Sequence, residues 1–212
     1  MEERAGVTDE RVEFFFDLSS PWTCLAFHNL PGVLARTGAA ARYRPILVGG
    51  VFNAVNPAVY AAREQTDNRR LQHSWKVLKD WARLAEVPMN FPSQWHPAKS
   101  VQAMRFAAAL EDDQDALIRF AREAFASYFD RQENLDDVAV LAAVADAEGL
   151  DGTALAAAAA SDAVKARLRA NTGEVVARGG YGSPTIFVDT TDMYFGNDQL
   201  PLVEAALKRT RG

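Results

Sequence analysis

Hydrophobic and polar positions follow two different patterns along this chain. Short, β-rich apolar runs bounded by turn residues occur near both ends. Between them, apolar residues recur at spacings of three and four, which is typical of amphipathic helices. The patterns therefore predict mixed α/β structure at both ends and an all-helical middle.

The N-terminal part has the pattern of a strand, a helix and a second strand. Residues 12–18 are almost continuously apolar, which indicates a central strand buried on both faces. Ser20 and Pro21 are the expected N-cap and first residue of a helix over 21–36. Residues 41–47 predict the second strand. Two strands joined through a helix are expected to be parallel.

The middle of the chain is rich in Ala, Leu, Arg and Glu, which favours helices. A proline-rich loop over 88–97 separates the first predicted helix from the second. Helices are predicted over 59–86, 99–110, 115–131, 136–148 and 152–167. Together they form a helical block.

The C-terminal part returns to mixed structure. A helix over 164–178, a strand over 185–189, a return strand over 193–195 and a last helix over 199–209 are predicted. The order is β-α-β, the helical block, then α-β-β-α. Without the block, a thioredoxin-like α/β sheet remains. We therefore expect a discontinuous thioredoxin-like domain of 1–50 and 162–212, with a helical domain of 51–161 inserted into it.

Composition narrows the classes of function. The chain has 212 residues, 49% of them hydrophobic, so it can bury a sizeable core. Its net charge is −5 and its basic residues are scattered, which argues against a nucleic-acid partner. No apolar run reaches the roughly 18 residues of a membrane span, and the N-terminus has no apolar signal segment, so we expect a cytoplasmic protein.

Cysteine usage is the next constraint. Cys24 is the single cysteine, so it cannot form an intramolecular disulfide or, alone, a metal cluster, and no metal site is expected. Its position in the predicted helix favours a buried, small hydrophobic residue over a reactive thiol.

The segment after the first strand carries the most specific signal. Ser20-Pro21-Trp22-Thr23 stands where a redox protein of thioredoxin type would carry Cys-x-x-Cys, but both thiols are missing. A helix N-terminus can hold an anion such as a thiolate and lower a thiol pKa, so this site suits binding of another molecule's thiol. Plain helix capping is the alternative reading of Ser20. No His motif stands beside it, which argues against a serine hydrolase.

Several segments, in order along the chain, resemble one family. They are 16–22, 43–47, 171–172 with 177–179, 182–185 and 195–198. The chain resembles the 2-hydroxychromene-2-carboxylate isomerases, which are related to kappa-class glutathione transferases in the DsbA-like branch of the thioredoxin superfamily. The resemblance covers nearly the whole chain and rests on no single motif.

The resemblance implies a glutathione site. Ser20 would donate a hydrogen bond to the glutathione thiolate, and Ser183, before a cis Pro184, would pair with the cysteinyl backbone. Asn197 and Asp198 would hold the γ-glutamyl end, with the Asp on the amine, although an Asp before a helix can equally serve as its cap.

Two expected contacts depart from the family pattern. Asn56 is the better candidate for the family's Asn after the second strand. His73 falls where the family has a Lys, with Arg69, Arg70 and Lys76 as neighbours, so the contact to the glycyl carboxylate is altered. A solvated side chain is the alternative role for His73.

The function that the resemblance implies is a glutathione-dependent isomerase of a chromene carboxylate or conjugated aromatic keto-acid, bound between the thioredoxin-like part and the helical block. Core packing is expected for each Trp, and at most one of Trp75 and Trp81 can face the cleft, since they do not share a helical face. A kappa-type glutathione transferase and a non-catalytic thiol-binding module stay open, and so does a homodimer. A thiol-disulfide oxidoreductase is disfavoured, because exchange needs a thiolate attacker.

Overall fold

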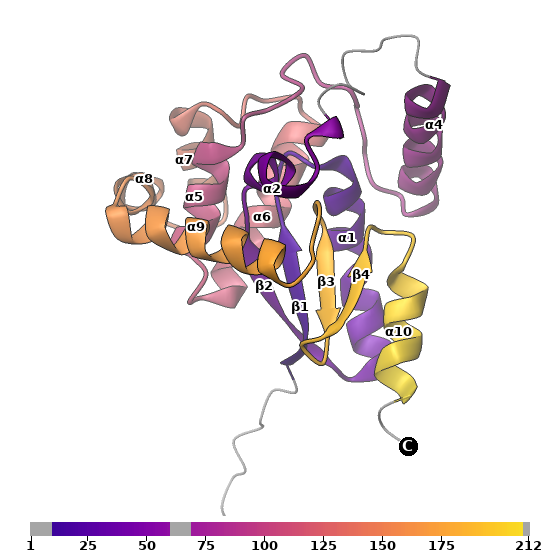
Figure 1. The fold of residues 1–212 in the computed structure, drawn as a ribbon. Helices are drawn as coiled ribbons and strands as arrows, with labels where there is room; N and C mark the ends of the chain where they lie inside the picture. Colours follow the sequence, from indigo (N-terminus) through magenta and orange to yellow (C-terminus); the bar gives the residue numbers. More distant parts are fainter. Residues whose placement is uncertain (1–9, 60–68, 210–212) are drawn as a thin grey trace, which may run out of the picture.

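The computed structural model describes residues 10–59 and 69–209, and its centre is a four-stranded sheet in the order β2-β1-β3-β4 (Figure 1). The strands are β1 (Glu10–Phe16), β2 (Ala40–Pro45), β3 (Thr185–Val188) and β4 (Asp192–Phe195). β1 pairs with β2 in parallel, whereas β3 is antiparallel to both β1 and β4. The predicted central strand and the parallel β-α-β start are therefore confirmed.

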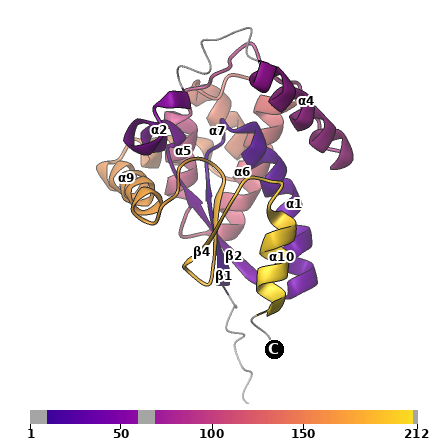
Figure 2. The ribbon, with the colours of Figure 1, turned by 45° about the vertical axis from the view of Figure 1, so that its right-hand side comes forward.

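Helices cover both faces of this sheet (Figure 2). Because successive side chains of a strand point to opposite faces, Phe14 and Phe16 of β1 belong to one apolar cluster and Phe15 to another. The first cluster includes residues of α1 (Pro21–Thr37) and α10 (Leu200–Arg209), and the second includes residues of α2 (Val48–Val55) and α9 (Asp162–Ala177). The apolar residues of β1 thus have packing partners on both faces of the sheet.

The remaining helices fall within the range of the predicted block, where most of them pack together beside the sheet and the first packs against α1 instead. They are α4 (Arg69–Leu84), α5 (Val101–Ala109), α6 (Gln114–Phe129), α7 (Val138–Ala147) and α8 (Gly152–Ala159). The larger apolar cluster runs from β1 through α1 into this block, where it includes Phe106 and Phe120. The division into two domains stays a prediction.

One helix prediction needs correction, and part of another lies outside the described residues. The predicted helix over 152–167 is wrong, because α8 ends at Ala159 and Ser161 starts α9, its Oγ accepting the Val164 N–H at 3.3 Å. The predicted helix over 59–86 is confirmed for Arg69–Leu84, which form α4, and its residues 60–68 lie outside the described residues.

α2 is a helix that the sequence pattern did not predict. Two glycines in its first turn resemble a turn signal. A Cβ on Gly50 would lie 3.1 Å from Cγ2 of Thr172 on α9, so the glycine permits close packing of α2 on α9. Val51 is fully buried in the second apolar cluster, and tertiary packing therefore stabilises a helix of low intrinsic propensity.

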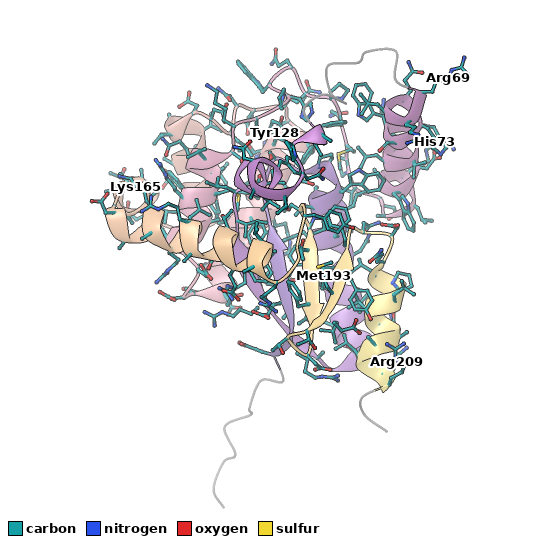
Figure 3. All side chains as sticks on the ribbon, in the orientation of Figure 1. Arg69, His73, Tyr128, Lys165, Met193 and Arg209 are labelled. Atoms are coloured by element: carbon teal, nitrogen blue, oxygen red, sulfur yellow. The ribbon has the colours of Figure 1, made fainter. Side chains whose placement is uncertain are left out.

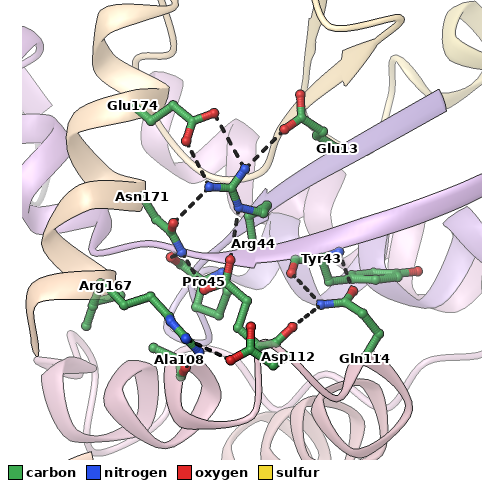
Figure 4. Close-up of polar contacts among 12 residues, drawn as sticks. Glu13, Tyr43, Arg44, Pro45, Ala108, Asp112, Gln114, Arg167, Asn171 and Glu174 are labelled. Atoms are coloured by element: carbon green, nitrogen blue, oxygen red, sulfur yellow. Dashed lines mark hydrogen bonds and ion pairs between the residues drawn. The ribbon is translucent and has the colours of Figure 1, made fainter. Parts of the chain in front are cut away.

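A buried polar cluster joins the sheet to its surroundings (Figure 4). Arg44 on β2 forms ion pairs with Glu13 (3.1 Å), Glu111 (3.0 Å) and Glu174 (2.8 Å). It also donates to Asn171 Oδ1 at 2.9 Å, and Asn171 Nδ2 donates to Glu111 at 2.7 Å. Arg44 thereby ties β2 to β1, to α9 and to the segment between α5 and α6.

Candidate functional site

The candidate site lies where β1 ends and α1 begins. Ser20 is the N-cap of α1, with extended backbone angles, and its Oγ accepts the Thr23 N–H at 3.2 Å. Pro21 is the first helical residue, as predicted. The second helical residue, Trp22, has no acceptor for its N–H within the helix, since the first N–H groups of any helix lack one. The Thr23 and Cys24 N–H groups are already bonded to Ser20, so this end of α1 offers the Trp22 N–H as a backbone donor, together with a positive dipole end.

Ser20 meets the loop before β3, which we call the proline loop (residues 182–184). The Ser20 hydroxyl donates to the Ser183 carbonyl oxygen at 3.1 Å. The Ser183–Pro184 peptide bond is cis, as predicted. Sequence positions more than 160 residues apart are thus brought into direct contact.

Asp17 directly follows the last residue of β1 and holds the segments of the site together. Sequence reasoning did not assign it a role. Its carboxylate is fully buried and accepts four hydrogen bonds: from the N–H and hydroxyl of Ser19, from the Val48 N–H, and from the Ser100 hydroxyl. Burial raises the pKa of Asp17, although these hydrogen bonds oppose the rise. The carboxylate joins the end of β1 to the starts of α2 and α5. The sequence signal that could have indicated Asp17 is its position as a charged residue within an apolar run.

A cleft of about 230 Å³ lies beside the proline loop. It is lined by Trp22, Val77, Trp81, Phe195, Gly196 and Asp198. The Gly196 N–H donates to the Pro184 carbonyl at 3.2 Å, which joins the Asp198 segment to the proline loop. The exposed Asp198 carboxylate among aromatic rings suits an ammonium group.

A larger groove of about 400 Å³ shares Trp81 with this cleft. Asn197 lines the groove and is buried, and its Oδ1 accepts from Asn29 Nδ2 at 2.8 Å. Asn197 Nδ2 is buried and has no hydrogen-bond partner within residues 10–59 and 69–209. Buried donors of this kind usually have partners, so a ligand or a water could supply the acceptor.

The other two residues predicted to contact glutathione, Asn56 and His73, do not line the cleft. Asn56 ends α2, one turn after Phe52, whose Cε1 is 3.7 Å from the position of a Cβ on Gly182. His73 is exposed on α4 (Figure 3), one helical turn before Val77, which lines the cleft. Within residues 10–59 and 69–209, neither Asn56 nor His73 forms a hydrogen bond with Ser20.

Trp75 and Trp81 lie as the sequence predicts, and Trp95 does not. Trp75 packs edge-on against Phe91 at a ring distance of 6.0 Å, whereas Trp81 lines the cleft. This confirms that at most one of the two faces a cleft. Trp95 is 43% exposed and donates to the Gln132 carbonyl, so the expectation of core packing is wrong there.

Cys24 is buried as expected, and burial raises its thiol pKa to about 12. Across residues 10–59 and 69–209, no group of His, Cys, Asp and Glu side chains could hold a metal ion. In the same ranges no helix combines the length and apolar character needed to cross a membrane.

A strand leading into a half-buried helix N-terminus, opposite a cis-proline loop before an antiparallel strand, defines a thioredoxin-like protein. The family model for the DsbA-like thioredoxin domain matches residues 11–208. The chain therefore belongs to the DsbA-like thioredoxin family.

Similar proteins confirm the resemblance drawn from the sequence. A 2-hydroxychromene-2-carboxylate isomerase of Sphingobium xenophagum is 30% identical over 92% of this chain and 97% of its own. The kappa 1 glutathione S-transferase of Rattus norvegicus is 26% identical over 93% of this chain and 91% of its own. A solved 2-hydroxychromene-2-carboxylate isomerase has the same fold, with a TM-score of 0.76 at 24% identity, covering 94% of this chain and 95% of that one.

Proposed function

We propose that the protein is a glutathione-dependent isomerase that acts on a chromene carboxylate or a related conjugated aromatic keto-acid. The observation that carries the proposal is the Ser20 hydroxyl, which stands at the N-terminus of α1 in the place of a redox thiol and faces Ser183. The near full-length similarity to a 2-hydroxychromene-2-carboxylate isomerase supports the reaction class.

When bound, glutathione would supply a thiolate that adds reversibly to a conjugated double bond, permits rotation about it, and then leaves unchanged. The chain's part is to hold that sulfur as an anion. Ser20 would turn its hydroxyl from the Ser183 carbonyl to the sulfur, and the Trp22 N–H would add a second donor. Hydrogen bonds to a charged acceptor favour the charged form, so these donors would lower the thiol pKa.

The residues around the cleft fit the rest of glutathione. The Ser183 carbonyl, once released by Ser20, can accept a peptide N–H. Asp198 would pair with the γ-glutamyl amine beside the faces of Trp22 and Trp81. His73, with Asn56, would lie toward the glycyl carboxylate. The aromatic substrate would lie against the apolar walls of the same cleft.

Ser20→Ala tests the proposal directly. With glutathione and 2-hydroxychromene-2-carboxylate, the wild-type protein should isomerise the substrate, and the variant should lose most of kcat. A charge-assisted hydrogen bond is worth roughly 1.5–3 kcal/mol, so the pKa of the bound thiol, followed by thiolate absorbance, should rise by about one to two units.

Because Ser20 also caps α1, Ser20→Asn is the matched control. Asn caps a helix as well as Ser does, so this variant separates lost capping from the lost hydroxyl. An unchanged thiol pKa in Ser20→Ala would refute the thiolate role of Ser20.

A kappa-type glutathione transferase is the second candidate, favoured by the kappa-class relative. It would use the same thiolate to conjugate a chlorinated aromatic acceptor, and product formation with that acceptor distinguishes it. A thiol-binding module would bind glutathione and catalyse neither reaction. Reduction of insulin by dithiol exchange should be absent in every case, because Ser20 and Thr23 carry no thiol.

A further inference from the structure

We propose that Thr23 is a positioning residue whose buried hydroxyl holds Ser183 in place while Ser20 binds the sulfur of the thiol cofactor. This inference rests on the proposed function. Thr23 stands where a dithiol protein of this fold would have its second cysteine, so the sequence suggests only a lost thiol there.

The contact is direct and fully enclosed. Thr23 Oγ1 lies 2.8 Å from Ser183 Oγ, and the same Ser183 Oγ accepts the Asp17 N–H at 2.8 Å. Thr23 and Asp17 have no exposed surface, and Ser183 is 6% exposed. A buried hydroxyl left without a partner is costly, so Thr23 depends on Ser183, and Ser183 is held by both Thr23 and Asp17.

Thr23 uses its hydroxyl differently from another buried threonine of the same helix. Thr37, at the far end of α1, donates back to the Val33 carbonyl at 2.9 Å, which is a local helix contact. Thr23 instead bonds across to the proline loop, 160 residues away in sequence. Its hydroxyl therefore joins two elements of the site.

The need for this contact follows from what Ser20 does. Ser20 and Thr23 are three residues apart on one face of the first turn of α1, and they hold Ser183 at two different atoms. When Ser20 turns to a bound sulfur, the Ser183 carbonyl loses that donor. The Thr23 and Asp17 contacts then remain to fix Ser183, whose backbone would pair with the cofactor.

The test compares Thr23→Val with Thr23→Ser and with the control Thr37→Val, which removes a buried hydroxyl elsewhere in α1. Hydrogen exchange is measured at the Gly182, Ser183 and Thr185 amides well below the unfolding temperature, and the glutathione Kd is measured by calorimetry. For Thr23→Val we expect loop exchange and Kd to rise about tenfold, from the loss of one buried hydrogen bond.

Three further results are expected. The pKa of the bound thiol should not change in Thr23→Val, because Ser20 is intact. Thr23→Ser should restore Kd to within about twofold, since the hydroxyl is kept. Thr37→Val should leave both loop exchange and Kd unchanged.

Unchanged loop exchange in Thr23→Val would overturn the inference, and so would faster exchange with an unaltered Kd, which would mean a purely structural contact. If Thr23→Val does not fold, Ser183→Ala removes the same hydrogen bond from the other side, together with the acceptor of the Asp17 N–H, and should raise Kd by at least tenfold. A wild-type protein that does not bind glutathione would refute the proposed function, and loop exchange would then decide alone whether Thr23 holds the loop.

Discussion

Replacing Arg44 with methionine would remove the centre of the buried polar cluster. The Arg44 side chain is 15% exposed and that of Glu111 is 5% exposed, so Glu111 would keep only its contact with Asn171. Removing one partner of a buried ion pair costs roughly 3–5 kcal/mol. Glu13 and Glu174 are more exposed and retain Arg178, so they add little. We therefore expect a loss of about 3 kcal/mol in the free energy of unfolding.

Urea and thermal unfolding measure this loss. For a chain of this length, each kcal/mol lowers Tm by roughly 2–4 °C, so Arg44→Met should melt about 6–12 °C below wild type. The matched control is Arg83→Met, whose side chain is 79% exposed in an ion pair with Asp80. A pair of that kind is worth up to about 1 kcal/mol. If Arg44→Met lost no more stability than Arg83→Met, the cluster would not stabilise the fold.

The pH dependence of the same variant gives an independent check. Burial alone would raise the pKa of Glu174, but the guanidinium groups of Arg44 and Arg178 hold it below its ordinary value of 4.5. A lowered folded-state pKa stabilises the protein above the unfolded value, and that stability is lost as the pH falls through the folded value. Glu174 keeps Arg178 in the variant, so the difference between wild type and Arg44→Met should narrow below about pH 4.5 only by the part of this lowering that Arg44 causes. A constant difference would contradict this account.

Three shorter predictions concern the site. Because burial raises the pKa of Cys24 to about 12, iodoacetamide at pH 8 should label it only after denaturation, and mass spectrometry of the native protein decides. Gly182→Ala would place a Cβ 2.8 Å from Phe195 Cε2 and should weaken glutathione binding in calorimetry, whereas Gly173→Ala, with open space around it, should not. His73→Lys should tighten glutathione binding and His73→Ala weaken it; equal Kd values would leave His73 as a solvated side chain.

The sheet could be predicted because each strand has a local signature. β1 is apolar on both faces, and the structure buries it on both. α2 had no such signature, since the glycine that lets it approach α9 also reads as a turn. The break between α8 and α9 was missed because an alanine-rich run continues through it, and only the Ser161 cap marks the new helix.

The residues of the site also fall into two groups, those that the sequence could indicate and those that it could not. Ser20 and Ser183 each precede a proline in a recognisable segment, so both could be selected, and the structure brings them together. The roles of Asp17 and Thr23 depend on hydrogen bonds to residues distant in sequence, such as Val48, Ser100 and Ser183. A contact of this kind leaves no local pattern, because neither residue type nor spacing indicates which partner the fold supplies.

Under the proposed function, the spacing of positions 20 and 23 explains how this fold could exchange redox chemistry for thiol binding. Residues three apart on the first helical turn lie on one face, which allows two thiols at these positions to react with each other. Here the same face carries two hydroxyls, and both reach Ser183, at 3.1 Å and 2.8 Å. Neither hydroxyl can attack a disulfide, but each forms a hydrogen bond that a thiol makes only weakly. The turn that would place a reactive pair therefore places two hydrogen-bonding groups on the loop that would receive a thiol from outside.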